Sequence, residues 1–156
     1  RDLYRFVYRM TGNRETAEDI VQETFLRLSR EDNHLPTEDA VRRWLFVVAR
    51  NLCISLFRQG SRILDTEFDE EYGLSSRERN PSEEALENEQ NLLVWQAVLS
   101  LPPSLREVVI LREYEKKSYL DIATLVGCPM GTVRSRLAKA RDFLKEKLQP
   151  LMEIQE

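Results

Sequence analysis

The chain has 156 residues, of which 42% are hydrophobic and 32% charged, and its formal net charge is −4. This composition excludes a chain that is disordered throughout, and no apolar run approaches the roughly 20 residues that a membrane-spanning helix needs. The first ten residues are amphipathic and do not form a secretion signal. We therefore expect a cytoplasmic protein that does not insert into a membrane.

The net charge conceals a separation of charges along the sequence. Residues 65–89 contain ten acidic and two basic side chains, so this segment carries −8 and the rest of the chain carries +4. A basic remainder beside an acidic segment is typical of proteins that bind a polyanion with one part only. The overall acidity therefore does not exclude a nucleic-acid-binding protein.

Helical periodicity begins at the N-terminus. Apolar residues recur every three or four positions up to Met10, and Asn13 is the expected N-cap of a second helix after a break at Gly12. The polar segment 29–40 contains Pro36 and predicts a loop before a third helix that ends near Arg58. The positions expected to face inward are Leu3, Phe6, Val7 and Met10, then Ala17, Ile20, Val21, Thr24 and Leu28, and finally Val41, Trp44, Leu45, Val48, Leu52 and Leu56.

The pattern changes at residues 59–82, where glycines, serines and acidic side chains predict a flexible linker. Helical periodicity returns near Glu83, stops at Pro102 and Pro103, and continues in three further segments near 104–115, 118–126 and 130–148. No segment alternates as a strand would. We therefore predict an all-α fold with two small helical domains, residues 1–58 and 83–150, joined by an acidic linker at 59–82.

The segment from Ser118 to Arg141 has the pattern of a helix-turn-helix. Ala123 and Gly127 are small where the two helices approach, and Ile122, Val126, Val133 and Leu137 are expected to face the core. The remaining positions of the second helix are cationic or hydroxylated, as base edges and phosphates in the major groove require, and its first backbone N–H groups are expected to bind a phosphate. An ordinary three-helix bundle with a solvated basic face is the alternative. The expected DNA-binding residues are Gly131, Thr132, Arg134, Ser135, Arg136, Lys139 and Arg141.

Three blocks of the sequence resemble the extracytoplasmic-function sigma factors, the small subgroup of the sigma-70 family. AEDIVQETFLRL, residues 17–28, resembles region 2.2, and RRWLFVVARNLCISLFRQ, residues 42–59, resembles regions 2.3 and 2.4. The block from Leu101 to Leu144 resembles region 4, and the three blocks follow the family's order and spacing. The chain begins inside the helix that the family places second, so we expect the first domain to be incomplete at its N-terminus.

The resemblance implies a partner for each block. Residues Asp19, Gln22, Glu23 and Phe25 are expected to bind the largest subunit of core RNA polymerase. The helix-turn-helix is expected to bind the duplex −35 element of promoter DNA, and the acidic linker to lie toward the active-site cleft, with a solubilising spacer as its alternative role. The third helix is expected to bind the single-stranded −10 element, with Asn51 reading a flipped base, through Arg42, Arg43, Trp44, Arg50, Asn51 and Arg58. The family also implies an anti-sigma factor as a partner.

The sequence contains no signature of catalysis. It has no P-loop and no Ser/His/Asp arrangement, and His34, Cys53 and Cys128 lack the spacing of metal ligands. We therefore predict a sigma factor that is not an enzyme, with no cofactor, no metal and no small-molecule substrate. One alternative is a helix-turn-helix regulator that binds duplex DNA without core polymerase, which leaves residues 17–28 unexplained. The other is an adaptor that does not bind DNA, which leaves the basic helix unexplained.

Overall fold

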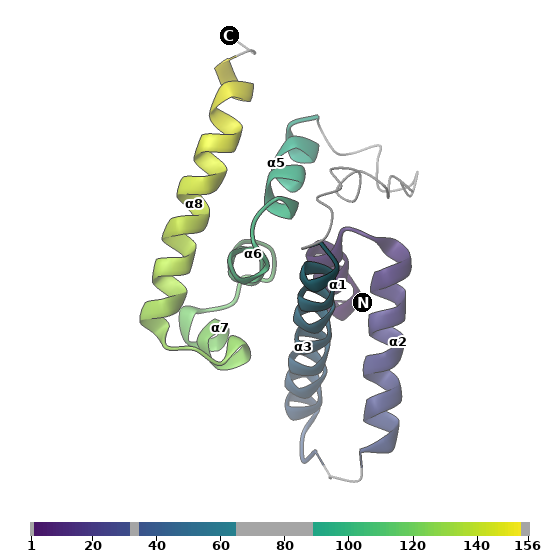
Figure 1. The fold of residues 1–156 in the computed structure, drawn as a ribbon. Coiled ribbons are helices and arrows are strands. Elements are labelled where there is room, and N and C mark those ends of the chain that lie inside the picture. The colour runs from purple at the N-terminus through teal and green to yellow at the C-terminus, as the bar shows by residue number, and fades with distance from the viewer. Residues whose placement is uncertain (1, 32–34, 65–88, 154–156) are drawn as a thin grey trace.

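The computed structural model describes residues 2–31, 35–64 and 89–153. They form two helical units that lie side by side (Figure 1). The N-terminal unit contains α1 (Asp2–Thr11), α2 (Arg14–Arg30) and α3 (Glu38–Leu64). The C-terminal unit contains α5 (Glu89–Leu99), α6 (Pro103–Val109), the π-helical turn η2 (Ile110–Tyr114), α7 (Tyr119–Val126) and α8 (Met130–Glu153). The predicted all-α fold with two helical units is confirmed, whereas most of the predicted linker, residues 65–88, lies outside the described residues.

The turn between α1 and α2 has the predicted geometry. Gly12 adopts a φ of 67°, in the left-handed region that glycine enters without steric cost. The side chain of Asn13 then accepts a hydrogen bond of 3.0 Å from the backbone N–H of Thr16, so Asn13 is the N-cap of α2. The residues predicted to face inward are buried in α1, at Leu3, Phe6, Val7 and Met10, and in the first half of α2, at Ala17, Ile20 and Thr24.

The third helix differs from the prediction in its length and in its inward face. It continues through Gly60 to Leu64, because a single glycine costs a helix only about 1 kcal/mol. Among residues 38–60 of this helix, the fully buried ones are the small Ala49 and Cys53, while Leu56 is 39% exposed. The prediction that Leu56 faces inward was therefore wrong: periodicity predicted the helix, but the neighbouring helices cover Ala49 and Cys53 instead.

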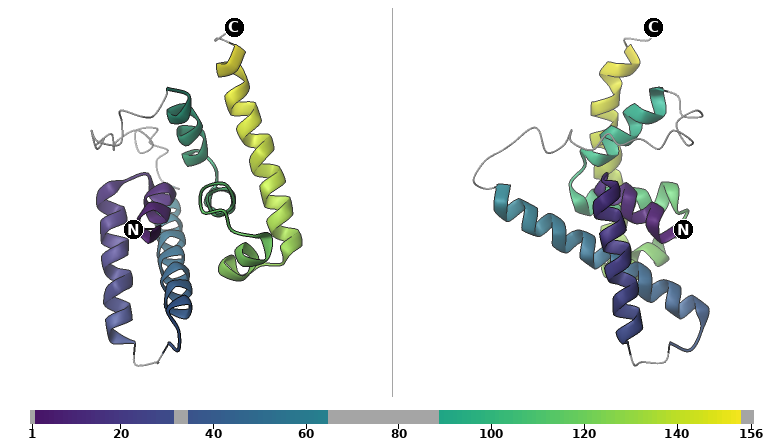
Figure 2. Two further views of the ribbon diagram at one scale, coloured as in Figure 1. Left: turned by 180° about the vertical axis from the view of Figure 1, so that it is seen from behind. Right: turned by 90° about the vertical axis from the view of Figure 1, so that its right-hand side faces the viewer.

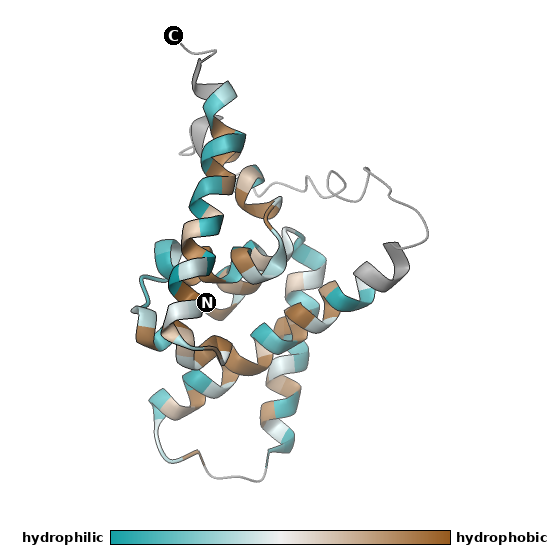
Figure 3. Ribbon diagram, turned by 60° about the vertical axis from the view of Figure 1, so that its left-hand side comes forward, coloured by the Kyte–Doolittle hydropathy of each residue, from teal (hydrophilic) through white to brown (hydrophobic). Residues whose placement is uncertain are grey.

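The two units share one hydrophobic core. Helix α1 contacts α5, α6 and η2, and α3 contacts α7, so the two units lie against each other (Figure 2). The colouring by hydropathy shows hydrophobic positions concentrated where the helices of the two units meet (Figure 3). The ring of Tyr8 stacks on that of Trp95 at a centroid distance of 5.6 Å. Gly12 lies against Leu99, and an added Cβ would stand 3.0 Å from both methyl carbons of that leucine. We call this packing of the two units the closed arrangement.

Cys53 lies in this core as a free thiol. Burial, followed by the nearby Glu107 carboxylate, raises the pKa of the Cys53 thiol to about 12. The thiol is protonated in both the folded and the unfolded state below about pH 8.5, but only in the folded state above it. Deprotonation of the unfolded chain therefore lowers stability by up to about 1.4 kcal/mol per pH unit between that pH and about 12.

Urea unfolding at pH 8, 9.5 and 10.5 tests this expectation. Wild-type stability should fall more steeply than that of Cys53→Ala, and the difference should grow with pH. Parallel pH profiles for the two proteins would contradict it.

Candidate nucleic-acid interface

The helix-turn-helix is formed by α7, α8 and the turn at Gly127. Ser118 caps α7 by accepting a hydrogen bond of 3.1 Å from the N–H of Asp121, and Gly127 ends it with a φ of 75°. The inward positions are as predicted: Ile122, Ala123, Val126, Val133 and Leu137 are all buried. These contacts fix the orientation of α8 and thereby decide which of its side chains reach solvent.

The outward face of α8 carries most of the predicted DNA-binding residues. Thr132 is half-buried, and its backbone N–H donates to the carbonyl of Pro129 at 3.0 Å. The prediction that this N–H is free to bind a phosphate was therefore wrong, because the first turn of α8 uses it. The residues exposed on or beside this face are Gly131, Arg134, Ser135, Lys139 and Arg141.

Helix α3 carries the residues predicted for the −10 strand. Arg42, Arg43, Asn51 and Arg58 are exposed, whereas Trp44 is half-buried. Within α3 itself, Arg42 forms an ion pair of 2.8 Å with Glu38. Three cations and an amide of α3 are therefore accessible to solvent. Arg43, Asn51 and Arg58 fall on one side of the helix, whereas Arg42 lies on the side opposite Asn51.

Helix α2 combines acidic, polar and apolar groups on its exposed side. Asp19 and Gln22 are exposed, and Phe25 and Leu26 are 49% and 48% exposed. Glu23 is half-buried and accepts from Arg27 at 3.0 Å. An apolar patch rimmed by acidic groups is typical of a protein-binding surface, and Leu26 belongs to it although we did not select it from the sequence.

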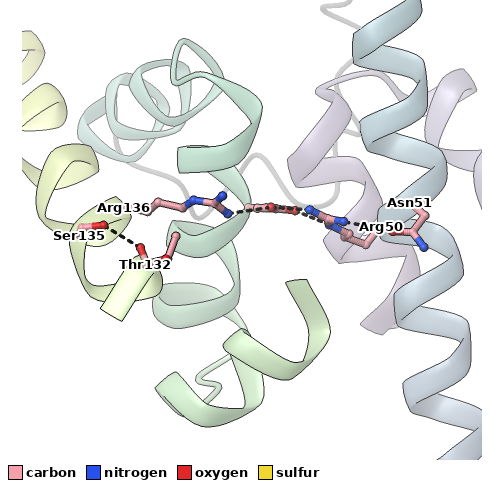
Figure 4. A network of polar contacts seen from close by, with 6 residues as sticks. Arg50, Asn51, Thr132, Ser135 and Arg136 are labelled. Atoms are coloured by element: carbon pink, nitrogen blue, oxygen red, sulfur yellow. Dashed lines mark hydrogen bonds and ion pairs between the residues drawn. The ribbon is translucent and has the colours of Figure 1, made fainter. Parts of the chain in front are cut away.

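Glu107 joins the predicted −10 and −35 residues (Figure 4). Its side chain is fully buried and accepts two hydrogen bonds from Arg50, of 2.7 and 2.8 Å. The same Arg50 donates to Asn51 at 3.1 Å, and Arg136 approaches Glu107 from α8 at 3.9 Å. Hydrogen bonding to Glu107 is the largest effect on Arg50 and raises its pKa. Arg50 and Arg136, both expected to face DNA, thus turn toward a carboxylate between the two units.

A half-buried cation, Arg106, precedes Glu107 in α6. Arg106 donates to the carbonyls of Met10 at 2.5 Å, of Leu99 at 2.5 Å and of Leu101 at 3.0 Å, and its guanidinium lies 5.0 Å from the centroid of the Phe57 ring. It therefore caps the C-terminal ends of α1 and α5, where a cation is favoured. Burial lowers the pKa of Arg106 to about 10, so it is still charged at neutral pH.

The sequence matches two family models, Sigma-70 region 2 over residues 1–63 and Sigma-70 region 4 over residues 91–144. The chain belongs to the sigma-70 family. It is 37% identical over 149 residues to the ECF RNA polymerase sigma-E factor of Haemophilus influenzae, covering 90% of this chain and 78% of that protein. It is 34% identical over 155 residues to the RNA polymerase sigma-H factor of Pseudomonas aeruginosa, covering 94% and 80%.

A solved structure resembles the whole arrangement of this sigma factor. The sigma factor RpoE of Bartonella quintana, crystallised with the anti-sigma factor NepR, has a TM-score of 0.71 and 27% identity, covering 95% of this chain and 90% of that one. The protein is thus an extracytoplasmic-function sigma factor that directs promoter-specific transcription initiation and is not an enzyme. The two alternatives, a regulator that works without polymerase and an adaptor, are excluded. Region 2 comprises α1–α3 and region 4 comprises α5–α8.

Arg106 and Glu107 were missed from the sequence. A charged pair interrupts the apolar residues between Leu105 and Leu111 of region 4, and that interruption was the available signal. Since buried charges require partners, such a pair indicates ionic contacts, but periodicity does not say with which helix. No described helix of the sigma factor is both long and apolar enough to cross a membrane.

Arg134 of region 4 tests whether α8 reads sequence. It is exposed, and its guanidinium lies 5.9 Å from the centroid of the Tyr119 ring. We expect Arg134→Ala to weaken binding to duplex −35 DNA by about 1–3 kcal/mol and to relax the preference at one base position. Lys145→Ala, a change of an exposed cation further along α8, is the matched control.

The salt dependence of binding distinguishes two kinds of contact at Arg134. Equal weakening on all sequences, with the salt slope reduced by about one, would assign Arg134 to a phosphate. Unchanged affinity and slope would remove it from the interface.

Proposed function

We propose that this sigma factor uses three separate surfaces for promoter recognition and polymerase binding. The outward face of α8 binds the duplex −35 element, the exposed face of α3 binds the single-stranded −10 element, and the exposed side of α2 binds core polymerase. The observation that carries the proposal is the accessibility of Asn51 on a helix whose Arg43 and Arg58 are also exposed on the same side. The polymerase and DNA work in the cytoplasm, which is where the proposal places the protein.

The chemistry of each surface suits its proposed partner. The α3 face presents Arg43 and Arg58 to a backbone and Asn51, with a donor and an acceptor, to the edge of an extruded base. The α8 face presents Arg134, Ser135 and Lys139, which match the acceptors of a major groove and its phosphates. Binding energy rather than ATP hydrolysis then offsets the few kcal/mol that base extrusion costs.

An anti-sigma factor is a further proposed partner. The sigma factor RpoE of Bartonella quintana was crystallised with one, NepR, and its likeness to this chain includes both regions. The apolar patch at Phe25 and Leu26 is a candidate contact, because a partner that covers it would block the proposed polymerase-binding surface.

The surface on α2 is tested by charge reversal. The double change Asp19→Lys and Glu23→Lys should weaken binding to core polymerase at least about tenfold while leaving helix content unchanged, since it places cations where anions rim the patch. Co-elution of the variants with core enzyme in the absence of DNA measures the effect. Asp142→Lys with Glu146→Lys is the matched control, because this pair has the same spacing on α8 and the same change in charge.

Run-off transcription from a promoter library completes the test. The α2 variant should lose transcription in proportion to its lost binding. Wild-type affinity in the α2 variant would move the polymerase interface elsewhere.

A further inference from the structure

We propose that Glu107 holds the free sigma factor in the closed arrangement by binding Arg50, and thereby withholds Arg50 from single-stranded DNA. The DNA half of this inference rests on the proposed role of the α3 face. The conformational half depends only on the contacts between regions 2 and 4.

The geometry at Glu107 is that of a bidentate ion pair. The Nε and one Nη of Arg50 reach different oxygens of the carboxylate, at 2.7 and 2.8 Å, across the boundary between α3 and α6. Such paired, charged hydrogen bonds are the strongest class in proteins. Arg136, in region 4 itself, stands at 3.9 Å and so gives only a weak second contact.

Glu107 depends on the closed arrangement for its strong partner. The carboxylate has no solvent exposure, and a buried charge without hydrogen bonds is strongly disfavoured. If region 4 separates from region 2, Arg50 leaves with α3, and among the described partners of Glu107 only Arg136 moves with it. Opening the chain therefore exchanges the bidentate contact with Arg50 for water and the distant Arg136.

Other contacts at the same boundary favour closure without competing for DNA. Arg9 lies over the Tyr114 ring at 4.4 Å and pairs with Glu115 at 3.5 Å, and Lys117 lies over the Phe46 ring at 5.6 Å. None of these five residues belongs to the proposed DNA-binding surfaces. The Glu107 contact differs because it occupies Arg50, which in turn holds the Asn51 amide.

Phosphate and Glu107 compete for the same group. A guanidinium binds a carboxylate and a phosphate with the same forked geometry, so the Nε–Nη2 fork of Arg50, which binds Glu107, cannot bind a phosphate at the same time. A −10 strand that uses this fork must therefore displace Glu107. Its apparent affinity is the intrinsic affinity multiplied by the fraction of molecules in which Arg50 is available. Binding of region 2 to the strand and separation of region 4 become one coupled step.

The conformational half is tested by energy transfer between dyes on the two regions of the full chain. Donor and acceptor are placed at Ser29→Cys on α2 and Lys145→Cys on α8, both exposed, in a Cys128→Ser background. Cys53 is buried and does not compete for the dyes. The free wild-type protein should give one population of high transfer efficiency.

Breaking the contact should open the chain. Arg50→Gln and Glu107→Gln should each raise the ratio of open to closed molecules at least about tenfold, with helix content unchanged in circular dichroism. Arg27→Gln, which removes an exposed cation paired within α2, is the matched control and should leave the ratio unchanged. Arg136→Gln should also leave the ratio unchanged, because the contact between Arg136 and Glu107 lies within region 4. Unchanged transfer in Arg50→Gln would overturn the inference, even if Glu107→Gln failed to fold.

The DNA half is tested with a labelled pool of random single-stranded 12-nucleotide DNA. Glu107→Gln should bind the pool several-fold more tightly than wild type, because Arg50 is released, whereas Arg50→Gln should not, because the cation is lost. Glu107→Gln could be open and yet bind the DNA pool no more tightly than wild type. That result would overturn the proposal that Glu107 withholds Arg50, and it would count against the α3 face as a strand-binding surface. It would leave the binding of core polymerase through α2 unaffected.

Discussion

Replacing Asn51 with alanine is expected to abolish promoter opening by the sigma factor bound to core polymerase. The side chain is exposed on α3, and its oxygen accepts from Arg50 at 3.1 Å. A base that leaves the DNA stack loses its pairing partner and needs its polar edge satisfied elsewhere, and alanine offers it no hydrogen bond. Permanganate reactivity of thymines around the start site should disappear, while binding to core polymerase and to duplex −35 DNA should change little.

A template already mismatched around the start site separates two roles of Asn51. Restored transcription on that template places the defect in melting, whereas partial rescue shows that Asn51 also holds the opened strand. Asn51→Asp is the informative companion, because it keeps an acceptor and loses the amide donor. Normal permanganate reactivity and normal transcription by Asn51→Ala would remove this residue from the −10 surface.

Replacing Arg106 with alanine is expected to lower the free energy of unfolding by about 3–5 kcal/mol. The substitution removes the charged hydrogen-bond donor of three backbone carbonyls, those of Met10, Leu99 and Leu101. It also removes the cation–π contact with the Phe57 ring. The loss should appear as a lower midpoint of urea unfolding with little change in the slope.

Two further variants define the origin of that loss. Arg106→Lys keeps the charge but not the fork of donors, so it should recover only part of the stability. Arg112→Ala, at a half-buried arginine that donates to the single carbonyl of Lys117 at 3.0 Å, should cost no more than about 1.5 kcal/mol. A loss below about 1 kcal/mol in Arg106→Ala would mean that the three carbonyls find other donors.

The helix-turn-helix could be predicted because its signals are local. The inward positions Ile122, Val133 and Leu137 repeat with the period of a helix, and the left-handed Gly127 lies where one helix has to end. The resemblance of three sequence blocks to the sigma-70 family predicted the partner of each surface. Local signals of this kind predict which residues face inward or outward, and they do so without knowledge of the rest of the chain.

The contacts between the regions could not be predicted in this way. Arg50 and Glu107 are 57 residues apart, and a helical period says only that Glu107 faces inward and Arg50 lies at an edge. The same limit explains the wrong prediction for Leu56 in α3. Leu56 and Cys53 fit helical periods equally well, and the position of the neighbouring helices decides that Cys53 is buried. Three of the four expected −10 cations face solvent as anticipated, but Arg50 has a partner that only the tertiary structure supplies.

The sequence separation between Arg106 and the Met10 carbonyl that accepts its hydrogen bond has a consequence during synthesis. Arg106 follows Met10 by 96 residues, and a ribosome adds roughly 5–20 residues per second. Met10 is therefore synthesised about 5–20 seconds before the arginine whose guanidinium caps α1. During that interval the side of α1 that later receives Trp95 and Leu99 is uncovered, and the nascent chain presents an apolar surface to chaperones.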